Sequence, residues 1–385
     1  MKFRKLAAMV LAGVMTVGVL GGAVVAHADE AVESPVAGKK IAYIMLMTPA
    51  TIFQMWSDNF EATAEALGME ADTFFCNDNA ETWQNTIAQC AASGYDGLML
   101  SHGGQEYAYQ YICDILEQYP DLKIVTFDTP FKDANGETAK IDGVTQFFQQ
   151  DAGFAAGLVE ALMALPENAE KVAAGEPLNI LQVQQGAGYN SPFDRRQVGY
   201  EPYVEDGSIV TVERIAPSND QQATSSMRDV TTATLAKYTD DDIDGIWCCY
   251  DAYAQGVYQA LSENNRQIPM VSVDICNEDI QFMQEEGSQW KACATTNWAL
   301  NGEFACRVLA CELADDYEAI EAASCYYPEI GAWMEIPSTI ITQEMVTTDI
   351  GEPVTIENLD KVAPESYSDT SWMPTTDWMI AILGR

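Results

Sequence analysis

Apolar and polar positions alternate along the chain with two different periods. Residues 41–47 form a continuous apolar run, which is typical of a strand buried on both faces of a parallel sheet. In residues 52–67, large apolar side chains recur every three or four positions, so we predict an amphipathic helix that ends at Gly68. The same alternation continues with predicted strands 71–76, 97–100 and 123–127 and predicted helices 81–92 and 107–118.

A second series of the same kind starts near residue 150. It contains predicted strands 178–183, 209–215, 243–249 and 270–273 and predicted helices 152–165, 193–205, 221–238, 252–264 and 278–286. Strands that alternate with helices in this way form βαβ units and parallel sheets. The chain has 385 residues, 48% of them hydrophobic, which is enough for two cores. We therefore expect an α/β protein with two Rossmann-like lobes.

The N-terminus has the pattern of a signal peptide. Three basic residues among the first five precede an apolar run at residues 6–25, and Ala26-His27-Ala28 offers small residues to a signal peptidase. We expect residues 1–28 to be removed and the rest to be exported to the periplasm or the exterior of the cell envelope. An uncleaved membrane anchor is the alternative, although the run is short for a span. No cysteine precedes Cys76, so no lipid anchor is expected.

Charge and histidine content exclude several classes of function. The chain has 58 acidic against 19 basic residues, a formal net charge of −39. So acidic a surface repels nucleic acid and anionic membranes, and neither is expected as a partner. Of the two histidines, His27 lies in the predicted signal peptide, which leaves His102 as the single possible base of a Ser-His-acid triad. We expect no enzyme activity, no cofactor and no metal.

The ten cysteines have two interpretations. In an exported chain they suggest disulfides, but most of them lie in helical or strand patterns among apolar residues. Buried small hydrophobic side chains are the interpretation that we favour for most of them. The pairing that we would test first joins Cys325 to Cys306 or Cys311.

Polar residues follow several of the predicted strands. Asp128 ends the strand VTFD, Asp274 ends VSVD, Tyr250-Asp251 follow GIWCC, and His102 follows GLML. Ligands of open parallel sheets bind beyond the carboxyl ends of the strands, where loops and helix N-termini converge. Two lobes that each present an acidic strand end would form a cleft rich in hydrogen-bond acceptors. A polar, uncharged ligand with many hydroxyls suits such a cleft.

Seven segments occur in a specific order along residues 38–345. They are IAYIMLMTPATIFQMWSDNFEATAEALG, SGYDGLMLS, IVTFD, DAGFAAGLVEALM, DRRQVGY, IDGIWCCYDAYAQGVYQAL and IPMVSVD. In this order they resemble the type I periplasmic binding proteins, and within them the ribose-, galactose- and xylose-type sugar receptors of ABC transporters. The resemblance implies two lobes joined by a three-segment hinge, a monomer, and an ABC transporter permease as partner.

The resemblance also implies ligand-binding positions in the first lobe. Ile52 and Phe53 fall where the family often places two aromatic residues that stack on the sugar ring, so one aromatic residue is retained. Asp128 falls on the acid that chelates two sugar hydroxyls. The next position, commonly arginine, is Thr129 here, which removes a fork of hydrogen-bond donors.

Further positions are implied in the second lobe and at the hinge. Arg196 falls on the second-lobe arginine of the family, and Asp274 on its second-lobe acid. Tyr250 takes the place of a hydroxyl-binding asparagine. Thr296 or Asn297 falls near the hinge glutamine. The frame resembles a sugar receptor while the contact residues differ, which leaves a nucleoside or an autoinducer-type ligand as an alternative.

Each of these residues also has a structural interpretation. Asp128 and Asp274 would each cap a turn after a strand, and Asp251 would be the N-cap of the following helix. Arg196 would lie on the surface at the start of a helix. His102 would be a loop residue first and a donor in the cleft second.

Three other features remain open. Asn219 stands where a stacking aromatic residue is common, and Tyr189 and Phe193 are candidates to supply that aromatic face. The acidic run at residues 240–242 suits a solvated turn better than a calcium site.

The expected layout has four parts: a signal peptide at 1–28, a first lobe at 38–145 plus 298–330, a second lobe at 146–297 plus 331–349, and a C-terminal extension at 350–385. The hinge would lie near residues 146, 297 and 331. The extension is apolar enough to pack on the lobes, and a docking surface is the alternative. We expect binding of a monosaccharide in the cleft without chemical change. A sensory receptor component and, less favoured, an exported glycosidase are the other classes.

Overall fold

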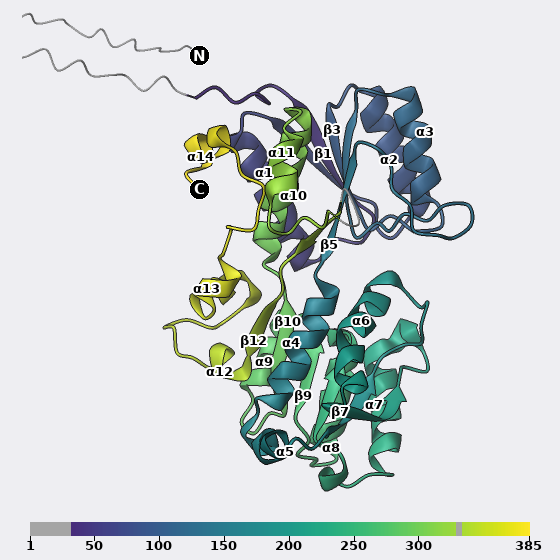
Figure 1. The fold of residues 1–385 in the computed structure, drawn as a ribbon, viewed down its shortest axis with the longest axis vertical. Coiled ribbons are helices and arrows are strands. Elements are labelled where there is room, and N and C mark those ends of the chain that lie inside the picture. Colours follow the sequence, from purple (N-terminus) through teal and green to yellow (C-terminus); the bar gives the residue numbers. More distant parts are fainter. Residues whose placement is uncertain (1–31, 329–332) are drawn as a thin grey trace, which may run out of the picture. The chain divides into compact units, whose positions relative to one another are not determined.

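Two six-stranded sheets organise the computed structural model, which describes residues 32–328 and 333–385 (Figure 1). The first sheet has the order β11-β5-β4-β3-β1-β2, and all of its strand pairs are parallel. Its strands are β1 (Lys40–Met45), β2 (Glu70–Phe75), β3 (Gly97–Ser101), β4 (Lys123–Phe127), β5 (Val144–Gln149) and β11 (Trp333–Ile336). The predicted signal peptide lies outside the described residues.

The second sheet has the order β12-β10-β9-β8-β6-β7, and its pairs are parallel except for β12, which runs antiparallel to β10. Its strands are β6 (Leu178–Val183), β7 (Ile209–Ile215), β8 (Gly245–Cys248), β9 (Met270–Val273), β10 (Trp290–Thr295) and β12 (Thr339–Thr342). The predicted α/β fold with two parallel-sheet lobes is confirmed. We call the part built on the first sheet the first lobe and the part built on the second sheet the second lobe.

Helices cover both faces of each sheet. The first-lobe helices are α1 (Thr51–Ala66), α2 (Ala80–Ala92), α3 (Ala108–Gln118), α10 (Trp298–Leu313) and α11 (Tyr317–Ala322). The second-lobe helices are α4 (Asp151–Met163), α5 (Ala169–Ala174), α6 (Ser191–Glu205), α7 (Ala223–Leu235), α8 (Asp251–Glu263), α9 (Asn277–Gln284) and α12 (Gln343–Val346). In the first lobe, α2 and α3 lie on one face of the sheet and α1 and α10 on the other (Figure 1).

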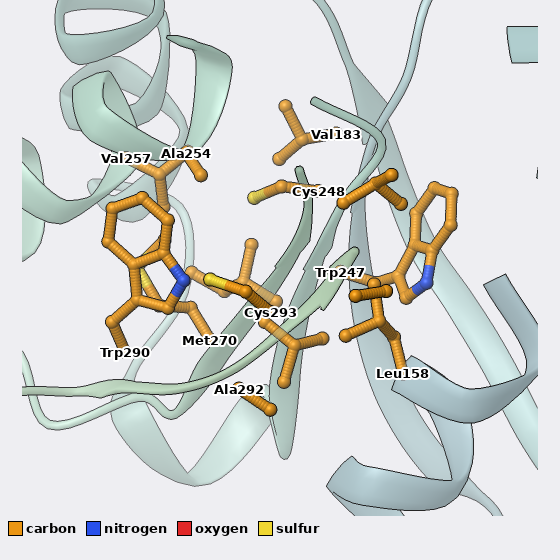
Figure 2. Close-up of a cluster of buried hydrophobic side chains, with 14 of the residues drawn as sticks. Leu158, Val183, Trp247, Cys248, Ala254, Val257, Met270, Trp290, Ala292 and Cys293 are labelled. Carbon is orange, nitrogen blue, oxygen red and sulfur yellow. The ribbon is translucent and has the colours of Figure 1, made fainter. Parts of the chain in front are cut away.

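Large aromatic side chains fill the second-lobe core on both faces of its sheet. Figure 2 shows the indole of Trp247 on the side of Leu158, which belongs to α4, and the indole of Trp290 beside Val257 of α8. Both tryptophans are fully buried. Parallel strands buried on both faces are expected to be apolar throughout, which is why the continuous apolar runs identified them in the sequence.

The expected lobe boundaries differ from those of the structure. The expectation placed residues 146–149 and 333–336 in the second lobe, whereas β5 and β11 pair with each other in the first sheet. The chain therefore crosses between the lobes after Gln149, at residues 296–297, and between β11 and β12. The expected crossing at 331 lies outside the described residues. Polar residues in β5 and β11 interrupt any continuous apolar run, which is the physical reason for the difference.

The C-terminal extension packs on both lobes. Residues 354–367, which include a 3-10 helix (Ile356–Lys361) and α13 (Pro364–Tyr367), contribute Ile356, Leu359 and Tyr367 to the second-lobe core. Beyond them, Trp372 and α14 (Asp377–Leu383) contribute to the first-lobe core.

All ten cysteines are free thiols in this structure, and Cys325 is bonded neither to Cys306 nor to Cys311. Eight of the ten are buried, Cys306 and Cys311 completely, and Cys113 and Cys276 are partly buried. Within residues 32–328 and 333–385, no helix is both long and apolar enough to cross a membrane.

Candidate functional site

Three candidate site residues share an unusual backbone conformation. His102, Asp128 and Asp274 follow β3, β4 and β9 directly, and their φ angles are 61°, 42° and 68°. A non-glycine residue in this left-handed region is uncommon. The conformation costs of the order of 1–3 kcal/mol and persists only where the surrounding structure holds it. Such residues concentrate at functional sites. The strain therefore marks the carboxyl ends of these strands as positions where side-chain direction matters.

A cavity of about 700 Å³ opens beyond these strand ends and is lined by residues of both lobes. Eight of the residues expected from the sequence line it: Phe53, His102, Asp128, Tyr189, Arg196, Tyr250, Asp251 and Asp274. Its volume lies within the range of about 300–1,000 Å³ that is usual for small-molecule sites. The sequence thus identified much of the lining of one cavity.

Thr296 and Asn297 are not among the lining residues. Thr296 is buried and accepts a hydrogen bond from Asn301 Nδ2 over 2.7 Å. The side-chain oxygen of Asn297 caps the N-terminus of α10, and its Nδ2 donates to the carbonyl of Tyr367 over 2.8 Å. Both residues hold the hinge crossing in place. Asn219, similarly, caps a short 3-10 helix.

Ion pairs form a continuous row across the site. Asp128 of the first lobe accepts from Arg195 Nη2 over 2.9 Å, and Arg195 Nε donates to Asp151 over 2.8 Å. On the other side, Arg196 Nε donates to the second oxygen of Asp151 over 2.9 Å, and Arg196 Nη2 lies 3.3 Å from Asp274. Because alternating charges satisfy one another, two arginines and three aspartates can be held in a water-poor site.

Helix α6 places both arginines. Asn190 caps its N-terminus by accepting from the amide of Phe193 over 2.9 Å. Farther along, α6 approaches α4 so closely that a Cβ at Gly199 would lie 1.9 Å from the carbonyl oxygen of Ala152. Only glycine fits there. This close approach sets Arg195 and Arg196 beside the fully buried carboxylate of Asp151, at the start of α4.

The surroundings shift the pKa of three site residues in different directions. Burial raises the pKa of Asp128, but the charge of Arg195 and the hydrogen bond from it help to outweigh burial, and the pKa lies below its usual value. Burial also dominates at Asp274, where it raises the pKa despite the nearby charge of Arg196. Burial lowers the pKa of His102, so its imidazole is neutral at pH 7. The site therefore offers a firmly ionised acceptor at Asp128 beside a neutral imidazole.

A second acidic group adjoins the cavity. Asp251, Cys276 and Asp279 each bring one potential ligand atom within 4.8 Å of the others. These groups already have partners, because Asp251 accepts from the amide of Ala252 and Asp279 accepts from Gln255 and from the amide of Cys276. Burial raises the pKa of Asp251 and that of Asp279, the latter to about 6. Asp279 forms a capping box with Cys276 at the N-terminus of α9. Asp251 was expected to be the N-cap of α8, but the N-cap is Tyr250 and Asp251 is the first residue of the helix.

The acidic run at residues 240–242 has a structural role too. Asp240 pairs with Arg266, and the carboxylate of Asp242 accepts from the amide and hydroxyl of Thr239. These contacts fix the turn that leads into β8, in agreement with a turn as the favoured interpretation.

Sequence reasoning missed several lining residues and one of the arginines. Arg195 is not among the site residues expected from the sequence, although two adjacent arginines are conspicuous in a chain with 19 basic residues. The extension supplies Ile356, and the start of α10 supplies Trp298, which lies edge-on to Phe53 at 5.9 Å between ring centroids. No local signal could assign Ile356 to a cavity, since its position depends on the path of the extension.

The fold agrees with the comparisons to known proteins. Residues 41–315 match the periplasmic binding protein domain, and the chain belongs to that family. Members of the family are binding proteins, and the predicted resemblance is confirmed. A search of curated protein sequences finds no significant match.

Solved structures give the same result. A sugar ABC transporter structure from Yersinia enterocolitica is 26% identical, with a TM-score of 0.67, and the alignment covers 90% of this chain and 95% of that chain. A 5-methylthioribose transporter solute binding protein from Thermotoga lettingae, in complex with 5-methylthioribose, is 17% identical with a TM-score of 0.66; coverage is 90% and 98%. A periplasmic ribose ABC transporter structure from Conexibacter woesei is 15% identical with a TM-score of 0.63, covering 85% and 96%. Each is similar to this chain over nearly its whole length.

Proposed function

We propose that this protein is an exported solute-binding protein that captures a small hydroxyl-rich ligand, a monosaccharide or a derivative of one, for the permease of an ABC transporter. The observation that supports this most directly is that polar residues of both lobes line one cavity. Asp128 and His102 come from the first lobe, and Arg196 and Asp274 come from the second. A ligand that bonds to both sets stabilises the arrangement in which the lobes are close.

The chemistry of the lining suits hydroxyl groups. A carboxylate such as Asp128 accepts two hydroxyl hydrogen bonds, and the guanidinium of Arg196 donates to hydroxyl oxygens. Phe53 and Tyr250 offer aromatic faces to the C–H face of a sugar ring. Binding requires no change in covalent bonds. The ligand would therefore be released chemically unchanged when the permease engages the closed form.

Export is part of the proposal. The N-terminal pattern predicts removal of residues 1–28, and the mature protein would act as a monomer outside the cytoplasm. Mass spectrometry of the secreted protein should find Asp29 at the N-terminus, and another N-terminus would contradict the predicted cleavage site.

The binding experiment is a thermal-shift screen of pentoses, hexoses, polyols, nucleosides and furanoses, followed by calorimetry on those that stabilise the protein. Asp128→Asn should weaken binding of the best sugar by about tenfold or more, because the variant loses a charge-assisted acceptor. The matched control is Asp142→Asn, since Asp142 is an exposed first-lobe acid outside the cavity. Wild-type affinity in Asp128→Asn would contradict the site, and hydrolysis of nitrophenyl glycosides would favour a glycosidase instead.

A further inference from the structure

We infer that the ligand is a sugar with an apolar substituent rather than a bare monosaccharide, an inference that rests on the proposed function. The cavity measures about 700 Å³, and a single sugar ring fills only part of such a volume. The chemistry of its lining changes from one part to the next.

The charged groups of the cavity lie close to one another. His102 Nε2 is 3.9 Å from Asp128, and Arg196 Nη2 is 3.3 Å from Asp274. Arg195 and Asp151 connect these two pairs. This part of the cavity is where the hydroxyls of a sugar ring would find partners.

An aromatic surface extends from that charged part. The guanidinium carbon of Arg196 lies 5.6 Å from the ring centre of Phe193, which stacks on Tyr189 at 5.6 Å. Phe193 also meets Tyr250 at 6.0 Å and Tyr253 at 5.9 Å. All four rings line the cavity, and Tyr189 and Tyr250 remain 45% and 37% exposed. The second lobe thus holds a set of linked rings with uncovered apolar surface.

Aliphatic side chains add to this apolar lining. Ile275 follows β9, Met47 and Ile52 come from the first lobe, and Ile356 comes from the C-terminal extension. The amide of Ile356 donates to Asn277 Oδ1 over 2.9 Å, which fixes the extension against the start of α9. The extension therefore forms part of the cavity as well as part of the core.

Acids near the aromatic rings already have hydrogen-bond partners in the protein. Asp220 accepts from Gln185 over 2.7 Å and from the hydroxyl of Tyr253 over 3.3 Å. Asp251 accepts from the amide of Ala252.

One aromatic ring is enough to stack on a sugar. The four aromatic rings and four aliphatic side chains therefore offer more apolar surface than an unsubstituted sugar can contact. Ligand hydroxyls placed against the carbon atoms of these side chains would lose water without gaining hydrogen-bond partners, which costs about 1–3 kcal/mol each. An alkyl, alkylthio or aromatic substituent would instead bury apolar surface there.

Calorimetry on matched ligand pairs tests the inference. The pairs are D-ribose with 5-methylthio-D-ribose, and D-galactose with methyl and phenyl β-D-galactopyranoside. In at least one pair the substituted sugar should bind about tenfold or more tightly than its parent, the gain usual for one added apolar group in a matching pocket. Bare sugars that bind as tightly as every substituted partner would overturn the inference and leave the proposed function intact. Failure of every sugar, bare or substituted, to bind would overturn both.

A pair of variants tests the contribution of the extension. Ile356→Ala should reduce the preference for the substituted sugar by several-fold while leaving affinity for the parent sugar nearly unchanged. Val354→Ala is the matched control, because Val354 is buried in the same core two residues away and does not line the cavity. Both variants should lower the melting temperature, so only the ratio of affinities separates them. An equal ratio in the two variants would contradict the role of Ile356.

Discussion

Arg195 on α6 of the second lobe donates a hydrogen bond to Asp128, which follows β4 in the first lobe, over 2.9 Å. The same guanidinium lies 4.6 Å from the ring centre of Phe148, a β5 residue of the first lobe. Arg195 thus contacts the opposite lobe twice. Arg195 also places a fork of hydrogen-bond donors beside Asp128. The arginine that commonly follows this acid in the family would supply such a fork, but the residue after Asp128 is Thr129 here.

Removal of this contact should open the ligand-free protein. A hydrogen bond between charged groups contributes about 1.5–3 kcal/mol, so Arg195→Gln should shift the ratio of open to closed forms by about tenfold or more. Small-angle X-ray scattering of the ligand-free variant should give a larger radius of gyration than that of the wild type. High salt should produce only a small part of the same change in the wild type, because both side chains are 18% exposed and a largely buried pair is weakly screened.

The matched control for Arg195→Gln is Arg228→Gln. Among the residues that the structure describes, this second-lobe arginine forms an ion pair with its neighbour Asp229 alone. The radius of gyration of Arg228→Gln should equal that of the wild type. Equal radii for Arg195→Gln and the wild type would show that the contact between Arg195 and Asp128 does not hold the lobes together.

Glu312 should make stability depend on pH. Its Oε1 accepts from the amide of Thr145 over 3.1 Å, and its Oε2 has no hydrogen-bond partner among the described residues. Burial raises the pKa of Glu312 to about 8, above the value near 4.5 expected when the chain is unfolded. The folded state therefore binds more protons between these values, so the stability contributed by the protonated group falls as pH rises through this window.

The test compares the melting of Glu312→Gln with that of the wild type at pH 5 and pH 9. A neutral amide replaces the carboxyl, so the variant should be more stable than the wild type by about 1–3 kcal/mol at pH 9 and within about 1 kcal/mol of it at pH 5. Parallel pH profiles for the two proteins would contradict the raised pKa.

Trp372 should account for much of the attachment of the extension to the first lobe. It is 8% exposed, its ring centre lies 5.0 Å from that of Phe304 on α10, and its Nε1 donates to the carbonyl of Asp369. Trp372→Ala should lower the free energy of unfolding by about 3–5 kcal/mol. Ile380→Ala, at a 49% exposed position of the same extension, should change it by less than about 0.5 kcal/mol. Wild-type melting of Trp372→Ala would instead favour a docking surface for the extension.

Regular elements of this protein could be predicted from sequence more completely than its site. The bounds of β6 and β9 match the prediction, because both strands are buried and mainly apolar. Strands β5, β10, β11 and β12, which flank the crossings between the lobes, were not predicted, because polar residues interrupt any continuous apolar run in them. Asp128 and Asp274 were found because strand ends are local features of the sequence.

Contacts between distant segments could not be predicted from the sequence. Arg195 reaches Asp128 only because Gly199 allows α6 to lie against α4, and that close approach has no signature in the local pattern. Ile356 reaches the cavity only through the path of the extension. Asn297 was expected to bind the ligand but does not line the cavity. This too depends on a distant contact, because its partner, the carbonyl of Tyr367, lies 70 residues farther along the chain.

The extension also acts as a tether on the opening of the lobes. Tyr367 is buried in the second-lobe core and Trp372 in the first-lobe core, so only the four residues 368–371 join two anchors. The five Cα–Cα steps from Tyr367 to Trp372 span at most about 18 Å when fully extended. Unless one anchor leaves its core, the mouth of the cavity can widen only within this reach. A short tether of this kind limits how far the lobes can separate, and so bounds the size of any ligand that enters before a hydrogen bond forms.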